Sequence, residues 1–253
     1  MRSLLLALLL VYVGTTAISG QAVAPVKGQF YGKLILVPQP DGRNMLVQDR
    51  YGYEDWEHKT LYAEAGFVSD GASIPRAAWS LVGGPWDGKY RNAAVIHDVG
   101  CVSHKYPWQD THRLFYEAMI DSGVSQSLAY TMYYAVLLGG PRWKLIGSKE
   151  ATTENALNSE VEDLRKSTTV PPGDSLAVTT QTSHTFSGFG ALHNPTRFAA
   201  HVFLVAPGHD VDQALLESFR DEALQREKTD KPITLEEIES RAESMAHTTV
   251  DPK

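Results

Sequence analysis

Histidine and aspartate side chains gather in one central stretch of this sequence. His97 and Asp98 are neighbours in a segment with helical periodicity, and Asp110 and His112 follow in a second such segment, after a loop of turn-forming and aromatic residues. Two short antiparallel helices that face each other can place a histidine base beside a metal ligand or an orienting carboxylate. We therefore predict a polar site between these two helices.

Each of these residues also has a structural interpretation. His97 would then be a buried histidine held by a backbone or side-chain acceptor, and Asp110 would be the N-cap of the second helix. A zinc site from His97, Asp98 or Asp110, and His112 has suitable ligand chemistry, but its spacing matches no standard zinc motif. Cys101 lies one turn after His97, which would suit a Cys-His nucleophile. A buried, apolar cysteine is the commoner case, and we expect that role for Cys101.

The loop that precedes the first helix carries two further polar candidates. Asp70 and Ser73 can hold this loop near the site, although turn formation and helix capping explain both residues equally well. The sequence lacks a G-x-S-x-G, an H-E-x-x-H and a phosphate-binding loop, so serine hydrolases, zincins and nucleotidases receive no support.

The N-terminal residues have the pattern of a secretory signal peptide. A basic start is followed by an apolar run over residues 4–13 and then by small residues, with cleavage expected after Ala22. The run is shorter than the roughly 20 apolar residues of a membrane-spanning helix. We expect residues 1–22 to be removed and the protein to be exported, periplasmic or secreted, with no transmembrane span.

Net charge excludes one class of partner. The formal charge is −7, and the segment from Asp210 onward contains twelve acidic and six basic residues. A nucleic-acid-binding protein would need a basic face, so we expect no nucleic-acid partner. The acidic C-terminal helices are instead candidates for contact with a protein partner.

Periodicity and turn residues predict an α+β fold. A small antiparallel β-sheet is followed by a core of three to four helices and by a C-terminal extension of mixed α/β character. We expect a hairpin from residues 29–37 and 43–51, short strands at 59–63 and 66–69, and helices at 73–81, 89–101 and 110–122. A fourth helix should begin at Ser125 or Ser127 and run to residue 138.

The sequence divides into four parts. After the signal peptide, residues 25–147 form a compact core domain that contains the His-Asp helix. Residues 148–190 combine a charged helix, over 149–166, with a Ser/Thr-rich linker or loop, over 167–190. Residues 191–253 form an acidic extension with a strand at 198–206 and two helices, at 211–228 and from 234.

Four motifs in order resemble a family of bacterial and phage proteins known only as a domain of unknown function. They are GFVSDGASIPR, AAVIHD, HRLFYEAM and MYYAVLLGGPRW, which lie between Gly66 and Trp143. The resemblance covers about a third of the chain. It implies a compact α+β domain and no particular activity.

The His-Asp helix is also similar to that of the calcium-dependent secretory phospholipases A. This resemblance implies that His97 is the general base, Asp98 a calcium ligand and Asp110 the group that orients His97. Gly83 and Gly84 would belong to the loop that supplies carbonyl ligands to calcium. The phospholipase disulfides that flank this pair are absent, because Cys101 is the only cysteine.

Two hypotheses follow. The first is an exported metal-assisted hydrolase that acts on a lipid or another small molecule, with calcium, or less favourably zinc, as its metal and with His97, Asp110 and His112 in catalysis. The second is a non-enzymatic accessory or binding protein of the cell envelope or of a phage, in which the His-Asp pair only holds helices together.

Overall fold

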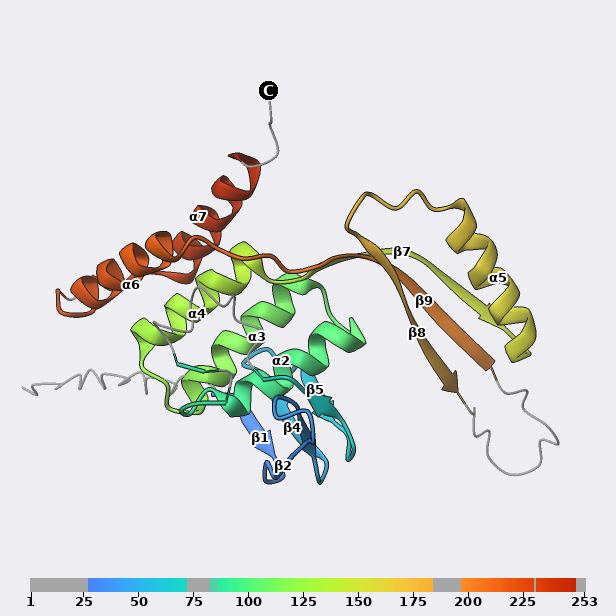
Figure 1. The fold of residues 1–253 in the computed structure, drawn as a ribbon, viewed down its shortest axis with the longest axis horizontal. Helices are drawn as coiled ribbons and strands as arrows, with labels where there is room; N and C mark the ends of the chain where they lie inside the picture. The colour runs from blue at the N-terminus through green and yellow to red at the C-terminus, as the bar shows by residue number, and fades with distance from the viewer. Residues whose placement is uncertain (1–26, 72–82, 85, 184–196, 230, 249–253) are drawn as a thin grey trace, which may run out of the picture.

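The computed structural model describes residues 27–71, 83–84, 86–183, 197–229 and 231–248 (Figure 1). The predicted signal peptide, residues 1–22, and the predicted helix at 73–81, with Ser73, lie outside these residues. Across the described part of the chain the fold is α+β, as predicted. The elements, in order, are β1 (Gln29–Tyr31), β2 (Leu36–Pro38), β3 (Met45–Val47), β4 (Tyr51–Glu54), β5 (Thr60–Ala63), β6 (Val68–Ser69), α2 (Arg91–Ser103), α3 (Trp108–Asp121), α4 (Gln126–Gly139), β7 (Arg142–Ala151), α5 (Glu154–Ser167), β8 (Ser175–Ser183), β9 (Arg197–Ala206), α6 (Gln213–Glu227) and α7 (Leu235–Thr248).

The N-terminal strands form two antiparallel sheets, β1-β4-β5 and β2-β3-β6. The predicted hairpin is present as β2 and β3, with Leu36 opposite Val47. The predicted first strand is interrupted, however, because Gly32 has a φ of +79°, which lies in the left-handed region. The chain therefore changes direction after β1, and β1 pairs with β4 instead.

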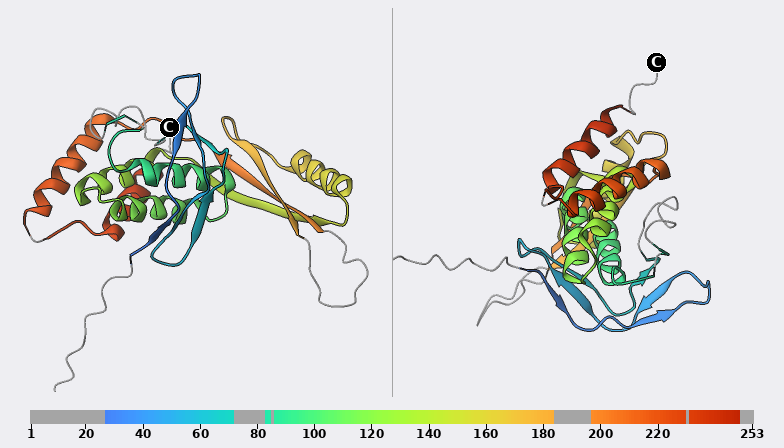
Figure 2. Two further views of the ribbon diagram at one scale, coloured as in Figure 1. Left: turned by 90° about the horizontal axis from the view of Figure 1, so that it is seen from below. Right: turned by 90° about the vertical axis from the view of Figure 1, so that its left-hand side faces the viewer.

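Helices α2, α3 and α4 form the centre of the molecule. The two N-terminal sheets lie against one side of this group of helices, and α6 and α7 lie against the opposite side (Figure 2). Every residue of α2 from Ala93 to Gly100 is buried, so this helix is enclosed on nearly all sides. Its polar residues must therefore find partners inside the protein.

Helix α3 begins two residues earlier than predicted. Its N-cap is Pro107, whose extended backbone leads into the helix at Trp108, so Asp110 stands in the first turn and is not the N-cap. Its carboxylate is still well placed there, because the N-terminal end of a helix dipole favours negative charge. Helix α4 starts after the predicted Ser125 and ends before Gly140.

The C-terminal sheet has the strand order β7-β9-β8 and projects from the helices together with α5 (Figure 1). The predicted apolar stripe of α5, which includes Leu157 and Val161, packs on one face of this sheet. The Ser/Thr-rich segment, expected to be a linker, contains β8, which pairs with β9 along its whole length. Threonine suits a half-exposed strand, but only the distant β9 supplies the hydrogen bonds that make one.

Helices α6 and α7 cover α4. Phe219 of α6 stacks on Tyr134 with 4.3 Å between ring centroids, and Ile238 of α7 is fully buried. Arg241 of α7 links the two helices by an ion pair of 2.7 Å to Glu222 of α6, and it also pairs with Glu237 of its own helix at 2.6 Å. None of the helices in the described ranges has the length and apolar character needed to cross a bilayer.

Candidate functional site

The structure brings His97 and His112 together across the seam between α2 and α3. Nε2 of His97 lies 2.8 Å from Nδ1 of His112, which is hydrogen-bonding distance. The two side chains are 1% and 0% exposed, and the His97 ring also packs against Phe115 with 4.7 Å between centroids. The pair is therefore sealed from solvent.

Burial keeps both imidazoles neutral. It lowers the pKa of His97 from 6.5 to about 4. The pKa of His112 is lowered well below its usual value, first by burial and then by electrostatic interactions with His97 and Arg142. Two neutral rings can share one proton, with one nitrogen donating and the other accepting. This arrangement satisfies a buried polar pair and does not require ionisation.

The far side of His112 is closely packed. A side chain at Gly140 would place its Cβ 2.9 Å from Nε2 of His112, so glycine permits the close approach of the chain after α4. Within the described ranges this Nε2 has no hydrogen-bond partner. The nearby backbone of Pro141 acts to raise the pKa of His112, but the effect of burial is larger. The Gly-Gly-Pro motif thus closes over the histidine.

Asp98 has a different surrounding from His97. Its carboxylate is buried and accepts a 2.5 Å hydrogen bond from the Ser69 hydroxyl, at the end of β6. The same hydroxyl accepts a 3.1 Å bond from the Gly71 backbone N–H. Asp98, predicted as a calcium ligand, therefore fastens the loop after β6 to the central helix.

The other predicted site residues bind partners other than His97. Asp110 forms a 2.9 Å ion pair with Lys59, and Asp70 forms one of 2.7 Å with Arg43. Gly84 donates its N–H to Asp87 and accepts a bond from the Tyr90 hydroxyl, and the neighbouring Gly83 has a positive φ of 96°. These contacts hold loops and helix ends in place.

Cys101 lies beside the histidine pair, with its Sγ 3.7 Å from Nε2 of His97. Burial, followed by the negative charges of Asp98 and Asp70, raises the pKa of this thiol well above its usual value. A nucleophilic cysteine needs a lowered pKa, so this environment favours an inert thiol. No group of three or more His, Cys, Asp or Glu side chains within the described ranges is arranged to hold a metal ion.

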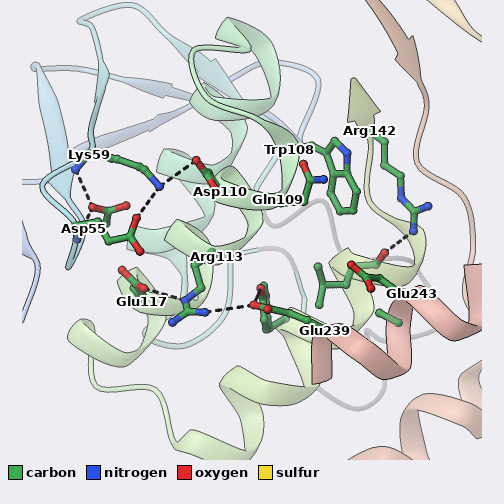
Figure 3. A pocket seen from close by; sticks show the side chains of 14 residues that line it. Asp55, Lys59, Trp108, Gln109, Asp110, Arg113, Glu117, Arg142, Glu239 and Glu243 are labelled. Carbon is green, nitrogen blue, oxygen red and sulfur yellow. Dashed lines mark hydrogen bonds and ion pairs between the residues drawn. The ribbon is translucent and has the colours of Figure 1, made fainter. Parts of the chain in front are cut away.

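A pocket of about 570 Å³ opens beside α3 (Figure 3). It is enclosed by the β4–β5 turn, α3, α4, the start of β7, and α7. The described residues that line it are rich in charge: Asp55, Glu57, Lys59, Trp108, Gln109, Asp110, Arg113, Glu117, Tyr133, Leu137, Arg142, Glu239, Ala242 and Glu243. We call this the α3–α7 pocket.

Two buried carboxylates in its wall support the fold. Burial raises the pKa of both Asp55 and Glu117. Asp55 accepts the backbone N–H groups of Glu57 and Lys59, at 2.9 and 2.7 Å, and Glu117 accepts that of Trp56 at 3.0 Å. They fix the β4–β5 turn and hold it on α3, which accounts for their burial without a catalytic role.

Basic side chains in the pocket differ in how they are paired. Lys59 and Arg113 are each bound by two carboxylates. Arg142 has no ion pair within the described ranges; one Nη donates to the Leu137 carbonyl at 2.7 Å, and the guanidinium lies 4.9 Å from the centroid of the Trp108 ring. Its Nε is buried without a hydrogen-bond partner in the described structure.

Sequence reasoning missed this pocket. Its wall combines the β4–β5 turn with α7, and these elements are separated by more than 170 residues. The available signal was the motif that ends in Pro141, Arg142 and Trp143, where a basic residue follows a helix stop. That motif marks the position of Arg142 but not its surroundings.

Comparison with known proteins gives a family description without an activity. Residues 45–136 match the family described as "Protein of unknown function (DUF1353)". Two proteins of Sinorhizobium fredii (strain NBRC 101917 / NGR234) are similar. "Uncharacterized protein y4iH" is 37% identical over 137 residues, which are 53% of this chain and 57% of that protein. "Uncharacterized protein y4jT" is 36% identical over 140 residues, covering 53% and 42%.

The chain thus spans about half the length of these curated relatives. No solved structure matches it. The resemblance to a family of unknown function is borne out at this general level, and the similarity to phospholipases stays a prediction.

Proposed function

We propose that this protein is an exported ligand-binding protein, in which the His97–Asp98 pair is structural and the α3–α7 pocket holds a small molecule with a carboxylate group. The observation that carries the proposal is Arg142, a cation in the wall of a 570 Å³ pocket, with no ion pair among the described residues. Ligand pockets commonly enclose about 300–1,000 Å³.

The chemistry of Arg142 favours a carboxylate. Its planar guanidinium matches two carboxylate oxygens at once, and stacking on Trp108 holds the group in one orientation. Gln109, also in the wall, adds an amide donor. An incoming carboxylate would therefore meet a donor set that is already positioned.

The rest of the ligand must suit an acidic surrounding. The described lining contains six carboxylates and three basic side chains. Glu243 has no ion pair among the described residues, and Figure 3 places it at the same end of the pocket as Arg142. A ligand with an ammonium group as well as a carboxylate satisfies both residues, and amino acids and short peptides have this chemistry.

Isothermal titration with alanyl-alanine and with its C-terminal amide tests this proposal. The free acid should bind more tightly than the amide. Arg142→Gln should weaken binding of the acid by about tenfold or more, the equivalent of one lost charged hydrogen bond, and should leave the amide unaffected. Arg220→Gln, which changes an arginine on α6 outside the pocket, is the matched control.

Two results would contradict the proposal: equal affinity for acid and amide, or no binding of either by a folded protein. Melting temperatures of both variants establish that the fold is intact. Export rests on residues 1–22 alone, and N-terminal sequencing of protein recovered from the periplasm or medium should begin at Val23.

The predicted calcium-assisted hydrolase is the second candidate, because the His97–His112 hydrogen bond lies one residue from Asp98. A general base must reach the proton that it removes, so His97, 1% exposed, would have to open to solvent. Activity on lipid esters with and without calcium, compared between the native protein and His97→Ala, tests it. Equal activity in the two proteins, or none in the native one, excludes this role.

A further inference from the structure

A second cavity of about 570 Å³ lies where the α2–α3 loop faces the C-terminal sheet. Its wall is mostly apolar, with a few polar groups among the aromatic rings. The residues that matter here are Tyr106, Trp143, Thr179, Gln181, His201 and Phe203. We call it the sheet cavity. It shares no described lining residue with the α3–α7 pocket.

Strand alternation explains why this face of the sheet is open. Ala200 and Val202 of β9 point to the side that α5 covers. His201 and Phe203 therefore point to the opposite side, together with Thr179, which is opposite His201 in β8. One face of the sheet is apolar and covered by a helix, and the other carries aromatic and hydrogen-bonding side chains.

A β-bulge in β7 shapes this face. Leu145 is opposite Phe203 and Ser148 is opposite His201, so both point into the same side although they are three residues apart. Regular alternation would place Leu145 and Ser148 on opposite faces of the sheet. The bulge adds one residue, Ile146, to β7, so that both side chains lie on the same face. As a result Leu145, which is 50% exposed, stands at the cavity, and Ser148 binds Nδ1 of His201 at 2.7 Å.

His104 closes the wall from the helical side. It is the C-cap of α2, with a left-handed φ of +50°, a conformation that is unfavourable for a non-glycine residue. Its ring is 8% exposed and lies 4.9 Å from the Trp143 ring and 5.0 Å from the Phe203 ring. Its Nδ1 is buried with no hydrogen-bond partner in the described structure.

The described lining of the sheet cavity has one charged side chain. Lys105 is the only formally charged side chain among its described lining residues, and its ammonium donates to the Thr60 carbonyl at 2.8 Å. Burial lowers the pKa of His104, which keeps that ring neutral near pH 7. Apart from this lysine, the described wall offers a ligand ring faces, hydroxyl groups and an amide.

We propose that the sheet cavity binds an uncharged ring compound that carries hydroxyl groups, a neutral saccharide. Trp143, Tyr106 and Phe203 supply the apolar surface against which a sugar ring packs. Thr179, Gln181 and His201 supply donors and acceptors for its hydroxyl groups. A few polar groups on an apolar wall are the usual composition of a small-molecule site.

Saturation-transfer NMR of the full chain tests this with methyl β-glucoside, N-acetylglucosamine and cellobiose as neutral ring probes. Sorbitol, which has the hydroxyl groups but no ring, and glucuronate, which has the ring and a charge, are the comparison compounds. At least one neutral ring probe should bind saturably and more tightly than both. Arg220→Gln, on α6 and outside the described lining of both cavities, should leave this binding unchanged. Because the two cavities share no described lining residue, the result is independent of the proposed carboxylate site.

The variant Thr179→Val removes one hydroxyl with little change of shape and should weaken binding about fivefold or more. Its control is Thr182→Val, the same change on the same strand at an exposed position that is paired with Phe198. Leu145→Ser should also weaken binding, by loss of apolar surface. The proposal is overturned if no neutral ring probe binds, if sorbitol or glucuronate binds as tightly, or if Thr179→Val and Leu145→Ser leave the affinity unchanged.

Discussion

The contact between His97 and His112 shows how a polar residue can serve the core. Each ring fills space among apolar side chains, and each satisfies one nitrogen of the other at 2.8 Å. A buried donor or acceptor that loses its partner costs about 1–3 kcal/mol, whereas replacement of both partners by apolar groups of similar shape can be nearly neutral. The histidines should therefore behave as a coupled unit.

We predict that His97→Ala lowers the free energy of unfolding by about 2–4 kcal/mol at pH 7, because it leaves a cavity and an unpaired Nδ1 on His112. The double change His97→Leu with His112→Leu should cost less than the sum of the two single leucine changes. Urea denaturation measures these differences. Additive single and double effects would show that the hydrogen bond contributes nothing to coupling. His209→Ala, at an exposed side chain, serves as the control and should change stability little.

At the scale of elements, the crossing of α2 and α3 depends on Gly100. A Cβ at this position would lie 2.4 Å from Cγ2 of Thr111 on α3 and 3.1 Å from Cδ1 of Leu61 on β5. Glycine costs helix stability relative to alanine, about 1 kcal/mol. Its presence in the middle of a central helix is explained by the close approach of these neighbours.

We predict that Gly100→Ala destabilises the protein by about 1–3 kcal/mol despite the better helix propensity of alanine. Adding Thr111→Ser, which removes the clashing methyl, should recover part of this loss. Thermal or urea unfolding of the two single variants and the double variant gives the comparison. A Gly100→Ala protein as stable as the native one would mean that the helices separate at little cost.

The helices could be predicted because their signals are local. Apolar spacing placed α2, α3 and α4 to within a few residues, and Ser125 and Gly140 marked the ends of α4 as expected. The start of α3 was misplaced because Pro107, with its fixed φ, took the N-cap that was assigned to Asp110. The Ser/Thr-rich sequence of β8 predicts a linker or loop, and it forms a strand only through pairing with β9.

The candidate sites were harder to predict, because most of their contacts join residues that are distant in the sequence. The approach of His97 to His112 could be predicted, because the two residues are close in the sequence and lie on neighbouring antiparallel helices. Arg142 and Glu239 line one pocket only because α7 returns to the central helices. The sheet cavity needs a bulge in β7 and a left-handed residue at His104, and neither has a clear signature in the sequence.

For the molecule as a whole, buried neutral histidines link stability to pH. Histidine has a pKa near 6.5 in the unfolded chain, and His97 has one of about 4 in the folded protein. Between these values the unfolded state binds more protons, so stability is complete above pH 6.5 and falls as the pH falls toward 4. His112, with its pKa also lowered, acts in the same direction.

Carboxylates act on the same pH range in both directions. The raised pKa values of Asp55 and Glu117 favour the folded state as the pH falls, because the folded protein then binds the extra proton. The lowered pKa values of Glu222 and Glu237 give stability that is lost at low pH. The total pH dependence therefore does not isolate the histidines, and a comparison with a variant that lacks them is required.

We predict that the double variant His97→Leu with His112→Leu gains stability relative to the native protein as the pH is lowered from 7 to 4.5. The shift of His97 alone corresponds to roughly 2–3 kcal/mol at pH 4.5. Urea unfolding of both proteins at pH 7, 5.5 and 4.5, at one ionic strength, measures the difference in their free energies of unfolding. The carboxylates are the same in both proteins, so their contribution cancels from this difference. If the free energy of unfolding changed with pH in the same way in both proteins, the histidines would bind protons as readily in the folded state as in the unfolded state. The imidazoles would then be open to solvent, as a catalytic His97 requires.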